Sequence, residues 1–348
     1  MLNFLVSLTE NGKIPDPLLR FGVRKLCSTR LRSLEREFKL DSSYKNYVSM
    51  IGSSPVAVET KAANEQHYEV PAEFYKLCLG PNLKYSCAYW EAGCTSLHEA
   101  ENRSLELTME HAELRDGMKI LELGCGWGSL SLAMAAKFPN ASITAVSNSN
   151  SQRAFITALA ESRGLKNLKV LTRDVSQIED FGAEKFDRIV SVEMFEHFRN
   201  YSTLLGRINN WLNADGKLFV HIFTHKQFPY LFETDGADNW MGKYFFTGGQ
   251  MPSQNLLNEF KNDLILDRQW EWNGTHYQKT SEAWLKNMDQ HKNQILRLFE
   301  KTYGSDISIQ WFNRWRMFYI AVAELFGFSS GNEWGVTHYL FKKKSARA

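Results

Sequence analysis

Short apolar runs alternate with helical spacing along the middle of the chain. The runs lie at about residues 118–123, 142–147, 168–172, 186–192 and 217–223, and each predicts a strand. Between them, apolar residues recur at helical spacing over about 128–138, 150–163 and 195–212. Strands that alternate with helices of this length predict an α/β fold with a parallel, doubly wound, Rossmann-like sheet. Ligands of such sheets bind beyond the carboxyl ends of the strands.

The flanking regions follow a different pattern. Residues 1 to about 60 and 99–115 are predicted to be helical, and after residue 225 the regular alternation stops. A strand is predicted near 264–272, a long helical region at about 280–328, and a last strand at 336–341. We therefore predict a helical N-terminal cap or lid at 1–115, a ligand-binding Rossmann-like core at 116–225, a substrate-binding cap with one core strand at 226–333, and the final core strand and tail at 334–348.

Composition narrows the class of protein. Of the 348 residues 43% are hydrophobic and 23% are charged, and the formal net charge is +2, so no nucleic-acid partner is indicated. No apolar run approaches the length of a membrane span. The N-terminus lacks a basic leader and Glu10 follows closely, so no secretory signal is predicted. Five cysteines without a CxxC pair argue against a disulfide framework, and we expect a cytoplasmic protein.

Two clusters of side chains each allow two interpretations. Basic residues gather between Arg20 and Arg36, and Arg20 and Arg24 would share one helix face. A solvated face is the ordinary explanation, and a membrane surface or an acidic partner is the alternative. Aromatic residues make up 13% of the chain and are dense between Phe219 and Trp334. They form either the core or the wall of an apolar pocket.

A glycine-rich turn follows the first predicted strand. It reads Glu122-x-Gly124-x-Gly126-x-Gly128. Glycine tolerates positive φ and lets a ligand approach the backbone closely. The spacing differs from the dinucleotide fingerprint. It resembles the first motif of methyltransferases that use S-adenosylmethionine, and an ordinary turn between strand and helix is the alternative.

The ends of the next two strands supply polar groups for this cofactor. Methyltransferases commonly carry an acidic residue for the ribose after strand two, whereas this chain has Asn148 and Gln152, which would hydrogen-bond instead. Asn148 could equally be a helix N-cap or lie close to one, and the two roles are compatible. After strand three, Asp174 would accept from the adenine amine and Val175 would pack on the ring. The alternative there is a surface turn.

Strand four ends at the most informative group of side chains, Glu193, Glu196 and His197. If a helix begins at Glu193, the other two lie on the same face at i+3 and i+4. Transfer of a methyl group to an amine needs a free lone pair, so a base of suitable pKa must take the ammonium proton. Carboxylates also attract the cation and stabilise the cationic product. The alternatives are ligation of a divalent metal, which methyl transfer does not require, and a helix-start carboxylate at Glu196.

Motifs along nearly the whole chain resemble plant coclaurine-type N-methyltransferases. They are Gln66-His67-Tyr68, Tyr85-Ser86-Cys87, Glu122 to Gly128, Glu193 to His197, Thr247 to Ser253, Gly274 to Tyr277 and Ala321 to Trp334. That family methylates amine nitrogens of benzylisoquinoline and related alkaloids. The resemblance implies S-adenosylmethionine as cofactor and a small-molecule amine as partner, and it is compatible with a homodimer.

The same resemblance implies roles for individual residues. Glu193, Glu196 and His197 fall on the catalytic positions, and no metal is expected. Ser86 falls on a cofactor contact, and Tyr85 beside it joins the turn and the strand ends as a cofactor-binding candidate. The substrate-binding candidates are Tyr68, Phe195, His225, Trp315, Phe318, Phe326 and Trp334. For the aromatic residues among them, a place in the core is the alternative.

Cyclopropane-fatty-acid synthases are the competing family. Tyr85 to Trp90, the glycine turn and Phe195-Glu196-His197 are similar there too. Those enzymes have a small residue where Glu193 stands, and an added carboxylate suits a cationic amine rather than a neutral alkene. The segment after strand five also differs, although the basic N-terminal helices would suit a lipid. A protein that binds the cofactor without catalysis is the third hypothesis. We predict an S-adenosylmethionine-dependent amine N-methyltransferase.

Overall fold

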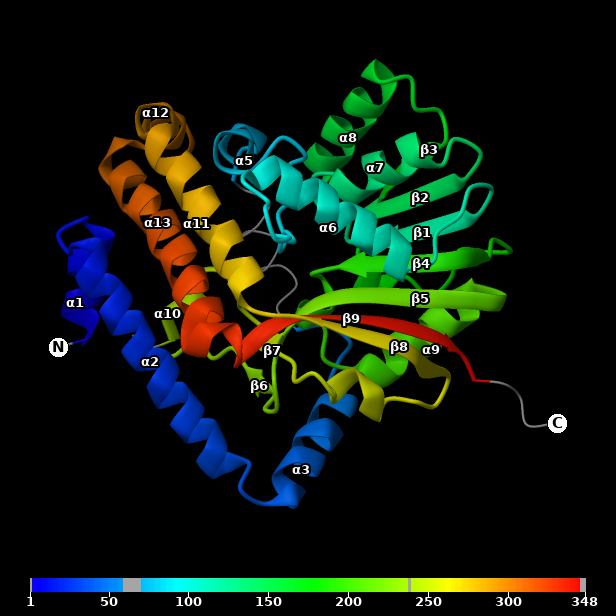
Figure 1. The fold of residues 1–348 in the computed structure, drawn as a ribbon, viewed down its shortest axis with the longest axis horizontal. Helices are drawn as coiled ribbons and strands as arrows, with labels where there is room; N and C mark the ends of the chain where they lie inside the picture. Colours follow the sequence, from blue (N-terminus) through cyan, green and yellow to red (C-terminus); the bar gives the residue numbers. More distant parts are fainter. Residues whose placement is uncertain (1, 59–69, 237–238, 345–348) are drawn as a thin grey trace.

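The computed structural model describes residues 2–58, 70–236 and 239–344. One large sheet and a separate layer of helices make up this part of the chain (Figure 1). The sheet order is β3-β2-β1-β4-β5-β9-β8. The strands are β1 (Lys119–Leu123), β2 (Ser142–Ser147), β3 (Leu168–Thr172), β4 (Phe186–Val192), β5 (Leu212–His225), β8 (Leu264–Trp272) and β9 (Trp334–Lys343).

Strands β1 to β5 are parallel, and β9 runs antiparallel between β5 and β8. This is the sheet of class I methyltransferases, so the predicted Rossmann-like fold class is confirmed. The last two positions of the sheet are filled by segments that flank a long helical insertion in the sequence. The carboxyl ends of β1, β2, β3 and β4 therefore meet at one edge, as expected of a parallel arrangement.

Side chains alternate between the two faces of the sheet. Ile120, Val190 and Phe219 pack with α6 (Leu97–His111) and α7 (Ser129–Lys137), and α8 (Asn150–Ser162) covers β2 on the same side. Leu121 and Ile189 point to the opposite face, which α3 (Asp41–Gly52) and α9 (Tyr201–Trp211) cover. Because both faces are buried, most residues in the middle of these strands are apolar.

The second layer is a bundle of helices next to the carboxyl ends of the parallel strands (Figure 1). It holds α1 (Leu2–Glu10), α2 (Asp16–Glu37), α5 (Ala72–Cys78), α10 (Trp240–Tyr244), α11 (Thr275–Gln290), α12 (Lys292–Tyr303) and α13 (Ser305–Gly327). Their buried faces form one aromatic-rich cluster, which also includes Phe223 of β5, Trp272 of β8 and Trp334 of β9. A small antiparallel sheet of β6 (Tyr230–Leu231) and β7 (Gln250–Met251), whose connecting segment contains α10, lies between the two layers.

One helix prediction is partly wrong. The helix expected at about 195–212 begins later: a 3-10 turn, η2 (Phe195–His197), comes first, and α9 starts at Tyr201. The long helical region predicted at about 280–328 is confirmed, and it is divided into the helices α11, α12 and α13. Gly304 separates the last two because its φ of 90° does not fit a right-handed helix. Apolar periodicity did not reveal either break, because the apolar pattern continues across them.

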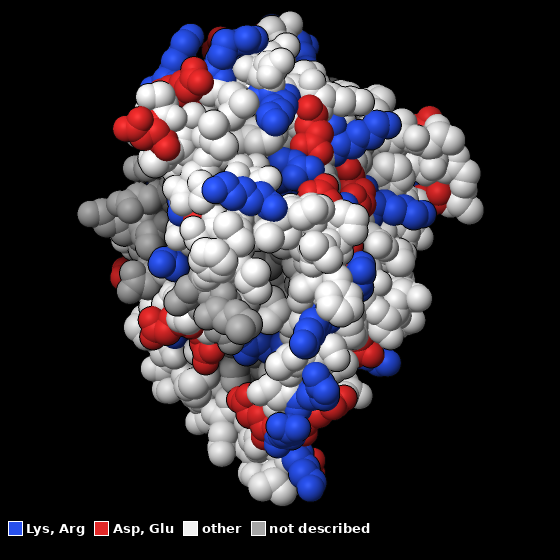
Figure 2. All heavy atoms as spheres, turned by 90° about the vertical axis from the view of Figure 1, so that its left-hand side faces the viewer, with Lys and Arg blue, Asp and Glu red and all other residues white. Residues whose placement is uncertain are grey.

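Two basic residues of α2 form ion pairs. Arg24 contacts Glu324 of α13 at 2.6 Å, and Arg20 bridges Glu324 and Glu282. Figure 2 shows basic and acidic side chains side by side on this face of the molecule, rather than a continuous basic surface. These ion pairs fasten α2 to the helical layer.

Helix α6 falls within the predicted N-terminal cap, but it packs on the sheet. Leu105 and Met109 contact the same cluster as Ile120 and Phe219. The division of the chain into four domains stays a prediction. In the described part of the chain no helix is long and apolar enough to cross a membrane.

Candidate active site

A cavity of about 1200 Å³ opens at the carboxyl ends of the parallel strands. One end lies over the glycine turn and the ends of β2 and β3. The other end is enclosed by aromatic side chains of the helical layer, and Glu193, Glu196 and His197 lie along the wall as well. The sequence predicts that the ligand binds at the carboxyl ends of the parallel strands. Both halves of the predicted site open into this one cavity.

The glycine turn has the backbone conformation that its sequence predicts. Gly124 and Gly128 have φ of 78° and 83°. A Cβ on Gly128 would lie 2.7 Å from Cγ1 of Ile156, so α8 packs directly on the backbone of the turn. Any other residue here would be strained by its φ and would push α8 away.

Glu122 precedes this turn and faces the cavity from β1. Its side chain is buried and accepts a hydrogen bond from the hydroxyl of Ser131. Burial raises the pKa of the carboxyl to about 7, although the bond from Ser131 lowers it. The sequence prediction of a cofactor contact at Glu122 is compatible with this position on the cavity wall.

The end of β2 is a buried polar cluster. Oε1 of Gln152 accepts from the hydroxyl of Ser147 at 2.7 Å. Ser149, and not Asn148, caps α8 by accepting from the backbone N–H of Gln152. Asn148 therefore lies next to the cap, as one of its two interpretations allowed, and both amides line the cavity.

Asp174 and Val175 line the cavity after β3. Oδ1 of Asp174 accepts from the backbone N–H of Ser176 at 2.9 Å and from the Ser176 hydroxyl at 2.7 Å. Oδ2 accepts a longer bond, 3.4 Å, from Gln177. One carboxylate oxygen thus caps the 3-10 turn η1 (Val175–Gln177), as the turn interpretation expects, and the contact with adenine stays a prediction.

The loop that carries Tyr85 and Ser86 is fastened by a buried lysine. Nζ of Lys84 donates to Oγ of Ser86 at 2.6 Å and to the carbonyl of Cys87 at 2.7 Å. Burial lowers the pKa of Lys84, and the charge of Glu193 acts in the opposite direction. Tyr85 contacts Trp284 of α11, with ring centroids 5.6 Å apart. Both predicted cofactor contacts line the cavity.

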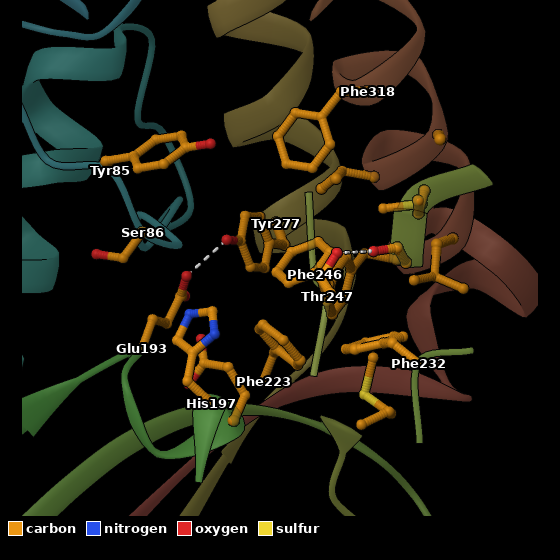
Figure 3. A pocket seen from close by; sticks show the side chains of 18 of the residues that line it. Tyr85, Ser86, Glu193, His197, Phe223, Phe232, Phe246, Thr247, Tyr277 and Phe318 are labelled. Atoms are coloured by element: carbon orange, nitrogen blue, oxygen red, sulfur yellow. Dashed lines mark hydrogen bonds between the residues drawn. The ribbon is translucent and has the colours of Figure 1, made fainter. Parts of the chain in front are cut away.

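Glu193 is contacted by polar groups from three separate parts of the chain, and Figure 3 shows its hydrogen bond to Tyr277. Its Oε1 accepts from the backbone N–H of Cys87 at 2.9 Å and lies 3.2 Å from Nε2 of His221. Its Oε2 accepts from the hydroxyl of Tyr277 at 2.6 Å. Glu193 has a positive φ of 45°, an uncommon conformation for a residue with a side chain. Burial raises the pKa of this carboxyl, whereas Lys84 and the donors lower it.

Glu196 is 2% exposed and lines the cavity. Its Oε2 is buried and has no hydrogen-bond partner among the described residues. Burial and the nearby charge of Glu193 raise the pKa of Glu196 well above its usual range. A buried carboxylate oxygen without a partner is costly, unless a ligand supplies a donor.

The three predicted catalytic residues do not share the face of one helix. Glu193 precedes the 3-10 turn that contains Glu196 and His197, so the expected i, i+3, i+4 arrangement is wrong. All three nevertheless line the cavity. The ring of His197 stacks on Phe246, with centroids 6.4 Å apart. The turn brings the side chains together where the α-helical spacing was expected to do so.

Aromatic side chains from separate elements enclose the far end of the cavity (Figure 3). Phe223 comes from β5, Phe318 and Phe326 from α13, and Phe232 and Phe246 from the segments around β6 and β7. Phe318 and Phe326 were predicted from the sequence, and their position on the cavity wall agrees with a substrate contact. The other three were not predicted, because their wall position depends on how the two layers pack.

Four other predicted substrate residues do not line the cavity. Phe195, Trp315 and Trp334 are each 1% exposed or less and belong to the core. Phe195 stacks with Tyr201 of α9, and Trp315 packs between Phe74 and Phe245. Nε1 of Trp334 donates to the hydroxyl of Tyr230.

His225 has a structural position as well. Its Nδ1 accepts from the backbone N–H groups of Gln227 and Phe228, so the ring closes the turn after β5. The prediction that these four residues line the substrate pocket therefore does not agree with the structure. Large aromatic side chains fill cores as readily as pockets. Tyr68 lies outside the described residues.

Tyr277, His221 and Lys84 are site residues that sequence reasoning missed. Tyr277 stands in a family motif, yet nothing local showed that its hydroxyl reaches Glu193. His221 lies in a strand that is buried on both faces, where polar residues are rare and therefore informative. Among the described residues no three His, Cys, Asp or Glu side chains form a group suited to a metal ion.

Comparisons with known proteins identify the family. The family model "Mycolic acid cyclopropane synthetase" matches residues 57–328. The (S)-coclaurine N-methyltransferase of Thalictrum flavum subsp. glaucum is 36% identical over 351 residues, which cover 98% of this chain and 95% of the relative. The chain belongs to the coclaurine N-methyltransferase family. It is an S-adenosylmethionine-dependent amine N-methyltransferase.

The crystal structure of coclaurine N-methyltransferase bound to N-methylheliamine and SAH matches with a TM-score of 0.90 and 33% identity, and 98% of each chain is covered. On the lipid side, the cyclopropane-fatty-acyl-phospholipid synthase of Escherichia coli K12 is 29% identical over 255 residues, or 71% of this chain and 63% of that enzyme. The amine enzymes match the whole chain, including the N-terminal helices, whereas the lipid enzyme matches a shorter part.

Proposed function

We propose that this N-methyltransferase methylates the amine nitrogen of an aromatic alkaloid of the benzylisoquinoline or phenylalkylamine type. The single observation that carries the proposal is the pair of buried carboxylates, Glu193 and Glu196, between the cofactor end and the aromatic end of one cavity. The unpartnered oxygen of Glu196 suits an ammonium N–H. The coclaurine relatives act on an amine of this kind by name.

The cavity fits S-adenosylmethionine at its glycine-turn end. The open backbone of Gly126, where a Cβ would meet no atom within 4 Å, leaves room for a ligand. Glu122, Gln152 and Asn148 line this space with polar side chains. When bound, the cofactor supplies an electrophilic methyl group on a sulfonium. Asp174 and Val175 are the proposed contacts of its base.

The chain's own residues perform the proton chemistry. An aliphatic amine has a pKa of about 10 and arrives as an ammonium at neutral pH. Glu193 and Glu196 attract this cation, and His197 accepts its proton, which frees the nitrogen lone pair. Imidazole, with an ordinary pKa of about 6.5, is suited to that exchange. The aromatic wall excludes water and packs on the carbon skeleton of the amine, and the carboxylates stabilise the cationic product.

The lipid alternative rests on the shared family model. It is weaker, because Glu193 places a second carboxylate beside the reacting atom, where a neutral alkene gains nothing from it. The homodimer and the cytoplasmic location remain predictions.

A panel of acceptors tests the function. Labelled S-adenosylmethionine is offered with a phenylalkylamine, a tetrahydroisoquinoline, a benzylisoquinoline and vesicles of an unsaturated phospholipid, and the products are analysed by mass. We expect a methylated amine, and a Glu193→Gln variant that binds cofactor but transfers slowly is the control. Cyclopropanated lipid without any methylated amine would overturn the proposal.

A further inference from the structure

Three histidines lead from Glu193 through the molecule to its surface. Nε2 of His221 lies 3.2 Å from Oε1 of Glu193. Nδ1 of His221 lies 2.7 Å from Nε2 of His338, and Nδ1 of His338 lies 2.9 Å from Nδ1 of His111. Every contact is within hydrogen-bond distance, and both ring nitrogens of the two inner histidines are used.

The fold brings these residues together. His221 of β5 and His338 of β9 are direct register partners, and both point to the sheet face that α6 covers. His111 is the last residue of α6. The rings of His221 and His338 are fully buried, and the ring centroids of Trp272 and His338 lie 4.2 Å apart. His111 is half-buried and stacks on Trp270 at 4.0 Å.

Burial keeps the three rings neutral. It holds the pKa of His221 and of His338 well below the usual range, and it lowers the pKa of His111 to about 4. A neutral imidazole has one N–H and one acceptor nitrogen. In each facing pair one nitrogen must therefore donate and the other accept, so the tautomers of all three rings are linked.

We propose that His338 and His111 are positioning residues for Glu193, because they fix the tautomer in which His221 donates its Nε2–H to the carboxylate. The inference rests on the proposed role of Glu193 as an anion that receives the substrate ammonium. An ionised carboxylate only accepts hydrogen bonds, so His221 donates from Nε2 and accepts at Nδ1. His338 then donates from Nε2, and His111 donates from Nδ1.

Other charged and titratable groups face this chain from the neighbouring elements. Lys84, Cys87, Tyr277 and Glu196 surround Glu193, and Lys84 also acts on His221 and His338. Glu110, Arg103 and Arg268 act on His111. Lys84 and the chain of N–H donors both favour the ionised form of Glu193, against the cost of its burial.

Loss of His338 as a donor would leave Nδ1 of His221 without its hydrogen-bond partner, so the tautomer with its hydrogen on Nε2 would lose the contact that favours it. In the molecules that then carry the hydrogen on Nδ1, the ring turns a lone pair toward Glu193. A lone pair facing a carboxylate favours the protonated acid. The pKa of Glu193 should then rise, and the site should lose its charge at a higher pH.

Nitrogen NMR of the full-length enzyme with ¹⁵N-labelled histidine tests the tautomers without any turnover. We expect His221 and His338 to be protonated at Nε2 and His111 at Nδ1. Each NMR signal is assigned with a variant in which that one histidine is replaced. His221 protonated at Nδ1 would overturn the proposal, even if the enzyme methylates amines as proposed. A correct tautomer pattern in an enzyme that leaves every amine unmethylated would instead overturn the function.

The pH profile of kcat/KM tests the consequence. In His338→Leu the acid limb should move up by roughly one pH unit, the shift expected for a lost hydrogen bond to a carboxylate. His338→Gln keeps an N–H donor and should restore the limb. His111→Leu removes the outer donor at a half-buried position, so it should shift the limb in the same direction even where His338→Leu does not fold. The exposed His98→Leu on the same helix is the matched control. A wild-type profile in a folded His111→Leu or His338→Leu would refute the proposal.

Discussion

The two ends of the cavity are built in different ways. At the cofactor end, the wall comes from short motifs at successive strand ends, Gly124 to Gly128, Asn148 to Gln152 and Asp174-Val175. At the substrate end, the wall comes from side chains far apart in the sequence, such as Phe223 of β5 and Phe318 of α13. The first end is a local product of the sequence, and the second exists only once the helical layer has packed on the sheet.

This difference separates the residues that sequence reasoning can find from those it cannot. A strand end followed by a glycine turn must face the ligand edge of a parallel sheet. An aromatic residue in a helix can face the core or a pocket, and Trp315 and Phe318 of α13 illustrate the two outcomes one turn apart. Glu193 and Glu196 lie at the boundary between the two ends of the cavity. Their motif is local in the sequence, but the residues that contact Glu193 are distant from it in the sequence.

The largest expected effect is at this boundary. Glu193→Gln removes the charge beside the ammonium and keeps the shape of the side chain. We expect kcat to fall about 10³-fold, because the cationic product loses electrostatic stabilisation, while the dissociation constant of the cofactor is unchanged. Steady-state kinetics and calorimetry measure the two. Wild-type turnover in this variant would remove Glu193 from the mechanism.

Glu122→Gln tests the cofactor end through stability. The pKa of Glu122 is raised to about 7 in the folded protein, above an ordinary value near 4.5. The folded state therefore holds a proton that the unfolded state releases, and the wild-type enzyme loses stability as pH rises through this window. Glutamine does not titrate, so the variant should gain up to about 3 kcal/mol in unfolding free energy at pH 8 relative to wild type.

This gain should vanish toward pH 4.5, and cofactor affinity should fall. Denaturant unfolding at pH 5 and pH 8 measures the first, and calorimetry the second. The exposed Glu161→Gln on α8 is the control and should change neither. Equal stability of Glu122→Gln and wild type at pH 8 would show that this carboxyl carries no burial cost.

His197→Ala tests the proton acceptor. We expect kcat to fall about 10²-fold near neutral pH, because the substrate ammonium keeps its proton. As the pH approaches the pKa of the amine, a growing fraction of the substrate arrives as the free base, so the deficit should shrink. Turnover measured from pH 6 to 10 gives the result. A deficit that is constant with pH would assign His197 to a role other than proton acceptance.

The smallest effect distinguishes a cavity-lining side chain of α13 from its neighbour in the core. Phe318→Leu removes part of the cavity wall and should raise KM for a benzylisoquinoline roughly 10-fold, which corresponds to the loss of about 1.4 kcal/mol of contact. Its matched control, Trp315→Phe, alters the core one turn away and should lower Tm without changing KM. A change of KM in Trp315→Phe alone would reverse the assignment of pocket and core.

The sequence by itself determined the sheet and the cofactor end. Apolar runs predicted β1 to β4 within a residue of their observed bounds, and β8 as observed. The glycine turn, with φ of 78° at Gly124, has the conformation that its residues require. These features follow from local rules, namely side-chain burial along a strand and the freedom of glycine at positive φ.

Only the tertiary structure decided the surroundings of the reacting atoms. The donors to Glu193 come from residues 87, 221 and 277, and no pattern along the chain connects them. The 3-10 turn at Glu196 replaced an expected helix, and four aromatic or imidazole side chains predicted for the pocket lie in the core. Which side of a buried element faces a cavity depends on the packing of two layers, and that packing is set by contacts between residues distant in the sequence.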